Sequence, residues 1–206
     1  GYAVAGRLGR ELAALWLVAC SLFFYGWWNP VFLILLCGSI LFNFTVGETI
    51  LATDADKKKQ SAVLFIGIAS NLALLFFYKY LFAIIGFFAN FGVLPQTWVG
   101  KVALPLGISF FTFTQIAFLV DAYQGKAREF RFTYYVLFVT YFPHLIAGPV
   151  LHHKEMMPQF DEDRNYRPDA ANFAVGLTIF AIGLAKKVLI ADSLADYATP
   201  VFAPGA

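Results

Sequence analysis

Long uncharged apolar runs are the feature that most restricts how this chain can fold. Residues 12–28, 61–78 and 102–120 contain no Asp, Glu, Lys or Arg. A membrane helix needs about 20 consecutive apolar residues, and in lipid each segment must satisfy its own backbone hydrogen bonds. Runs of this length and composition therefore predict helices that cross a bilayer.

Composition supports the same class. Hydrophobic residues make up 60% of the chain and charged residues 14%, against about 45–50% and 25% in soluble domains. The net charge of +2 gives no basis for a nucleic-acid partner, so the surrounding partner we expect is the lipid bilayer.

The predicted fold is all-α, a polytopic transmembrane helical bundle in a single domain over 1–206. We expect about six membrane segments, at 12–28, 31–51, 61–78, 102–120, 133–151 and 172–190. Residues 81–94 are too short to cross by themselves and fit either an interfacial helix or a continuation of the preceding span. The segment near 141–151 contains Pro143, Gly148 and Pro149, which predict a broken or re-entrant helix.

Lys and Arg are concentrated in particular loops. Segments 1–11, 53–60 and 121–131 together carry eight of them, whereas the turn at 29–30 has none. Because cytoplasmic loops carry an excess of Lys and Arg, we expect these three segments to be cytoplasmic. The side of 152–170 depends on whether 133–151 crosses fully.

The histidines are the first candidates for chemistry. His144, His152 and His153 all lie within 141–160. Histidine is a natural general base near neutral pH, and ionisable groups at membrane depth are costly. The alternative is that His144 bonds a neighbouring helix and that His152 and His153 are interfacial polar residues. Their spacing gives no metal-binding signature.

A polar stripe is the second candidate. Ser109, Thr112 and Gln115 lie three residues apart and so share one helical face. Such a stripe either bonds neighbouring helices or lines a cavity or substrate path. Asp121 is expected to end this span in water, and 154–169 to be a solvated loop.

Five segments carry a resemblance to a known family. They are SLFFYGWWNPVFLILLCGSILFNFTVG (21–47), FFYKY (76–80), LPLGISFFTFTQIAFLVDAYQG (104–125), YFPHLIAGPVLHHKEMMPQF (141–160) and GLAKKVLIADSLA (183–195). In this order they resemble the membrane-bound O-acyltransferase family, in its bacterial branch that O-acetylates alginate and other extracellular polysaccharides. They span nearly the whole chain, so the resemblance is more specific than any single motif.

The resemblance implies an O-acyltransferase of the bacterial cytoplasmic (inner) membrane. It implies an acyl thioester as donor, either acetyl-CoA or an acyl carrier, and no bound cofactor. It also implies a polysaccharide acceptor, or a partner acetyltransferase in the envelope.

The family's catalytic histidine lies near a His-Gly-x-x-Trp-like stretch, and no such stretch occurs in these 206 residues. We therefore expect that histidine downstream of Ala206, with this chain as the N-terminal part of a larger enzyme and inactive alone. The alternatives are a transporter or acyl-group conduit, and a non-catalytic scaffold of a polysaccharide export complex.

Overall fold

A computed structural model describes residues 1–93, 95, 103–127, 131–145, 153–162, 165 and 169–202. Every regular element in these residues is a helix, which confirms the all-α prediction. The helices are α1 (Tyr2–Leu8), α2 (Arg10–Trp28), α3 (Pro30–Ala52), α4 (Lys57–Phe76), α5 (Phe82–Asn90), α6 (Ile108–Tyr123), α7 (Phe132–Thr140), α8 (Phe142–Leu145), α9 (His153–Asp161), α10 (Ala170–Ala185) and α11 (Asp192–Phe202), with π-helical turns η1 (Phe77–Leu81) and η4 (Lys186–Ala191).

The chain divides into two compact units, residues 1–166 and 167–206. The described residues of the second unit form one continuous helical run, α10–η4–α11, which begins where the Asp169 side chain accepts a hydrogen bond from the Ala171 N–H at 2.9 Å. The prediction of a single domain stays a prediction.

Four helical runs of the described residues are long and apolar enough to cross a membrane: Arg10–Trp28, Pro30–Ala52, Lys57–Asn90 and Ala170–Ala198. Many of their large apolar side chains are exposed, among them Trp27, Ile34 and Phe65. In a soluble protein such a surface would aggregate, whereas in lipid it is the expected outer surface. The chain is thus a multi-pass membrane protein.

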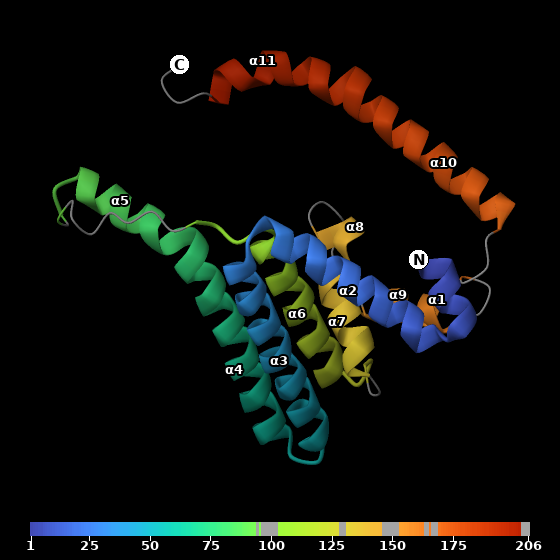
Figure 1. Cartoon of the computed structure of the whole chain (residues 1–206). Coiled ribbons are helices and arrows are strands. Elements are labelled where there is room, and N and C mark those ends of the chain that lie inside the picture. Colours follow the sequence, from blue (N-terminus) through green and yellow to red (C-terminus); the bar gives the residue numbers. More distant parts are fainter. Residues whose placement is uncertain are drawn as a thin grey trace. The chain divides into compact units, whose positions relative to one another are not determined.

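Residues 81–90 of the segment 81–94 belong to the run Lys57–Asn90, in which α4, η1 and α5 follow one another without an interruption. The choice between an interfacial helix and a continued membrane span stays a prediction. Figure 1 shows the run bending between α4 and α5, as expected for a π-helical turn inside an α-helix.

Helix α6 lies inside the bundle and packs against α3, α4 and α7 (Figure 1). It begins at Ile108 rather than near 102, because Gly107 adopts a left-handed conformation (φ 67°) directly before it. A Cβ on Gly107 would lie 3.0 Å from the Leu145 carbonyl oxygen, so glycine also permits the close approach of α8. At 16 residues α6 is about 24 Å long, shorter than the hydrocarbon core of about 30 Å. A short helix is tolerated here because the surrounding helices, rather than lipid, cover its ends.

The predicted break begins at Tyr141, whose ψ of 102° ends α7. Pro143 then lies in the first turn of α8, where the missing N–H costs no helical hydrogen bond. The helix break is confirmed at this point, while Gly148 and Pro149 lie outside the described residues.

Two other expectations were wrong. Asp121 does not end the span in water, because it is 3% exposed within α6, which continues to Tyr123. Residues 153–161 are not a loop but the helix α9, which packs against α7. Met156 and Met157 are buried there, and apolar burial explains why this polar stretch is ordered.

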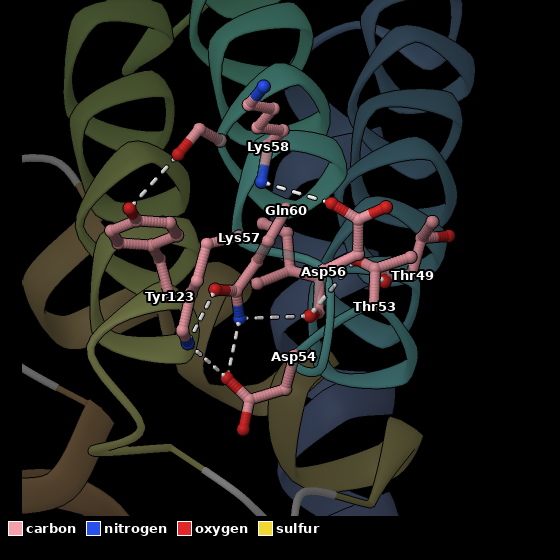
Figure 2. A network of polar contacts seen from close by, with 10 residues as sticks. Thr49, Thr53, Asp54, Asp56, Lys57, Lys58, Gln60 and Tyr123 are labelled. Carbon is pink, nitrogen blue, oxygen red and sulfur yellow. Dashed lines mark hydrogen bonds and ion pairs between the residues drawn. The ribbon is translucent and has the colours of Figure 1, made fainter.

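The hairpin between α3 and α4 is held by a polar network (Figure 2). Gln60, only 1% exposed, donates to the Ile50 carbonyl oxygen at 3.2 Å and to Asp54 at 3.1 Å. Lys57 donates to the same Asp54 oxygen at 2.6 Å. Asp56 caps α4 by accepting from the backbone N–H groups of residues 58 and 59. These contacts hold the ends of α3 and α4 together at the hairpin.

The described residues of the three basic segments lie at one end of the first unit. The hydroxyls of Ser61 and Tyr123 are 3.0 Å apart, which joins the start of α4 to the end of α6 (Figure 2). Arg131 pairs with Glu11, which joins the starts of α7 and α2. We call residues 7–11, 53–60, 121–127 and 131 the basic end.

Because the basic segments lie together and are rich in Lys and Arg, we predict that all of them face the cytoplasm. After replacement of Cys20 and Cys37 by serine, we expect K58C and K126C to resist an impermeant thiol reagent added to intact cells, because both belong to the Lys-rich side. N29C, in the turn at the opposite end of α2, should react. Labelling of position 58 from outside would reverse the assignment.

Close packing at Gly67 gives a second prediction. A Cβ there would lie 2.8 Å from Leu119 and 2.9 Å from Val46, whereas one on Gly38 meets nothing within 4 Å. G67L should therefore lower the unfolding free energy by about 1–3 kcal/mol, and G38L should change it little. Thermal unfolding in detergent, followed by circular dichroism, measures both. Equal stability of the two variants would contradict the packing.

Candidate functional site

A cluster of buried amides lies near the middle of three packed helices. Asn43 of α3, Asn71 of α4 and Gln115 of α6 are each no more than 3% exposed. Because lipid offers no hydrogen bonds, these side chains can bond only one another or other polar groups of the packed helices. We call Ser39, Asn43, Asn71 and Gln115 the amide cluster.

Asn43 is the centre of the cluster. Its Nδ2 lies 3.1 Å from the Asn71 Oδ1 and 2.5 Å from the Gln115 Oε1. Asn71 donates back to the Asn43 Oδ1 at 2.6 Å and to the Gly67 carbonyl oxygen at 2.8 Å. Gln115 also donates to the Ser39 hydroxyl at 3.1 Å. The reciprocal Asn43–Asn71 pair therefore joins α3 to α4, and Gln115 joins α3 to α6.

The cluster borders a hollow between α3 and α4. Ser39, Asn43 and Asn71 line it together with Ser70, and its volume is about 380 Å³. The remaining walls are apolar or glycine: Ile34, Leu35, Gly38, Phe42 and Leu74. Amide and hydroxyl groups hold no proton that titrates near neutral pH, so this site can bind or support a group but cannot act as a general base.

The structure gives the predicted polar stripe three different roles. Gln115 belongs to the amide cluster, so it joins helices, as one of the two alternatives held. Ser109 accepts a hydrogen bond from the Lys79 ammonium at 3.2 Å. Thr112 is fully buried, and its hydroxyl has no hydrogen-bond partner within the described part of the chain.

The histidines are only partly placed. His144 lies in α8 and His153 begins α9, but the positions of their side chains, like the whole of His152, lie outside the described residues. Their roles therefore stay predictions.

Sequence reasoning missed Ser39, Asn43 and Asn71. A signal was present, because Asn43 and Asn71 are single amides near the centres of apolar runs. A polar residue in such a position is commonly bonded across helices. Their mutual pairing, however, depends on how each helix is rotated.

The reciprocal pair can be tested by a double-mutant cycle. Asn43→Ala and Asn71→Ala should each destabilise the bundle, and their coupling energy should be about 0.6–1.7 kcal/mol, the range for hydrogen bonds between membrane helices. Thr45→Ala is the control, because that exposed hydroxyl bonds only within its own helix. Denaturation in mixed micelles gives the free energies, and strict additivity of the two substitutions would refute the pairing.

Comparison with curated proteins gives consistent relatives. A peptidoglycan O-acetyltransferase of Helicobacter pylori is 43% identical, over 89% of this chain and 39% of its own length. Probable alginate O-acetylases of Azotobacter vinelandii and Pseudomonas putida are 39% and 37% identical, over 92% and 95% of this chain. This chain covers 38% and 40% of their respective lengths, so it spans about two fifths of the relatives it matches.

No solved structure matches the chain significantly. The profile described as MBOAT, membrane-bound O-acyltransferase family, matches residues 14–203. That match covers all the helices that form the amide cluster and most of both units. The chain therefore belongs to the membrane-bound O-acyltransferase family.

Proposed function

We propose that this chain forms part of a membrane-embedded enzyme that transfers an acetyl group to a hydroxyl of a cell-envelope glycan. The observation that carries the proposal is the agreement among relatives. One relative is named as a peptidoglycan O-acetyltransferase and two as probable alginate O-acetylases, so all three names describe acetyl transfer to a polysaccharide. The matches cover 89–95% of this chain. The two kinds of relative share the acetyl transfer in their names and differ in the acceptor.

The reaction we propose begins with an acyl thioester, supplied as acetyl-CoA or on an acyl carrier. The acceptor hydroxyl attacks the thioester carbonyl, so a C–O bond forms and the C–S bond breaks. The hydroxyl proton passes to a general base, and the departing thiolate takes up a proton. A positioned base contributes about 10²–10⁴ in rate, and exclusion of water protects the thioester from hydrolysis.

In this proposal the described bundle supplies the frame of the enzyme. The amide cluster contains no titratable group, so the general base must come from elsewhere. We place it on the histidine that the family resemblance puts downstream of Ala206. The enzyme would lie in the bacterial cytoplasmic membrane, with its basic end toward the thioester donor and the glycan on the other side.

The three histidines of the chain test this division of roles. In cells that express the complete protein, H144A, H152A and H153A should each retain acetyl transfer within about tenfold, because none of them is the proposed base. Removal of the true base should reduce transfer about 10²–10⁴-fold. Glycan-bound acetyl is the measured quantity, normalised to the amount of protein in the membrane.

A loss of 100-fold or more in one histidine variant, at unchanged protein level, would assign the base to that residue. Expression of the 206 residues alone gives the matching control, and we expect no transfer from them. Robust transfer by this short chain would also move the base into these residues. Normal glycan acetylation in cells without the protein would overturn the proposed function altogether.

A further inference from the structure

Lys79 lies at the membrane boundary opposite the basic end. It follows Lys57 by 22 residues of continuous helix, a rise of about 33 Å at 1.5 Å per residue, and the hydrocarbon core is about 30 Å thick. Tyr78 and Tyr80 flank it, as aromatic residues do at membrane interfaces. The Ser61–Tyr123 and Lys79–Ser109 contacts therefore mark the two ends of one packed helix pair.

The exposed Lys79 ammonium has a hydroxyl and an aromatic ring as neighbours, and no carboxylate partner in the described part of the chain. It donates to the Ser109 hydroxyl at 3.2 Å and lies 5.4 Å from the centre of the Tyr80 ring. By contrast, Lys57 and Lys187 each lie 2.6 Å from an Asp oxygen. A lysine that merely extended into water would need no such fixed neighbours.

Lys79 lies within the π-helical turn η1. A π-helical turn accommodates one extra residue, which rotates the following residues by about 100° relative to a regular α-helix. Such turns occur frequently at functional sites. Here the turn coincides with the lysine and with Tyr80, while Ser109 comes from the first turn of α6.

We propose that Lys79 and Ser109 bind a phosphate oxyanion at this boundary. Because the boundary is the level of the lipid headgroups, the source of the phosphate is an anionic phospholipid. Within the described residues, one of the three ammonium N–H groups is used on Ser109, so two remain. Because the Ser109 oxygen accepts that bond, its own O–H is left to donate. The two ammonium N–H groups and the Ser109 O–H therefore lie close together. Charge-assisted hydrogen bonds from an ammonium are among the strongest that a phosphate can accept.

The test uses the complete protein in nanodiscs and a phosphatidylglycerol that carries a photoreactive headgroup. Cross-links mapped by mass spectrometry should fall in 76–81 and 106–112. K79Q should reduce them about tenfold, which corresponds to 1.4 kcal/mol, and S109A should reduce them less. K79R, which keeps the charge, should retain them. K58Q is the matched control, because Lys58 is an exposed lysine at the basic end.

Competitors identify the source of the phosphate. Excess phosphatidylglycerol should suppress the cross-links, and phosphatidylcholine should not. Suppression by inorganic phosphate alone would keep the oxyanion site but overturn its assignment to a lipid. Cross-links that persist in both K79Q and S109A, with helical content and melting temperature unchanged, would overturn the site. If K79Q does not fold, S109A and K79R still decide the outcome.

Discussion

Asn43 cannot exchange its hydrogen-bond partners for water, because it lies 1% exposed near the middle of a helix that crosses lipid. Its amide must therefore be satisfied by Asn71 and Gln115. Apolar contacts alone would not impose this geometry, since lipid tails are as apolar as leucine and packing leaves helices free to rotate. The requirement that three amides meet fixes the rotation of α3, α4 and α6. The rest of the first unit is packed around that arrangement.

The spans could be predicted from the sequence because their signal is local. Helix formation in lipid depends on length and hydropathy, so α2 and α3 begin and end within two residues of the expected positions. The break at Tyr141 was predictable for the same reason, since proline acts on its own turn. The start of α6 was not, because hydropathy does not reveal that Gly107 adopts a left-handed conformation (φ 67°) directly before Ile108. Burial of Asp121 likewise depends on neighbours that periodicity does not reveal.

The candidate site was less predictable than the fold, because its partners lie far apart in sequence. Ser39 and Gln115 are 76 residues apart, and Lys79 and Ser109 are 30 apart. Ser109, Thr112 and Gln115 were correctly predicted to share one helix. The spacing of residues on a helix, however, does not identify the element that packs against each of them. A 16-residue helix passes several neighbours over its length, so its first turn meets η1 and its middle meets α3. Each stripe residue therefore has a different role.

Gly67 shows that close packing and polar pairing depend on each other. Its carbonyl oxygen accepts a hydrogen bond from Asn71 at 2.8 Å, and the absence of a Cβ lets the same turn of α4 approach Leu119 of α6 and Val46 of α3. A side chain as large as leucine here would push these helices apart, and the 2.6 Å bond from Asn71 to Asn43 would lengthen with them. An amide pair weakens steeply once its atoms leave hydrogen-bond distance, and in lipid no water replaces the lost partner. Glycine at this position therefore preserves a polar contact one turn away, although it has no side chain with which to make any.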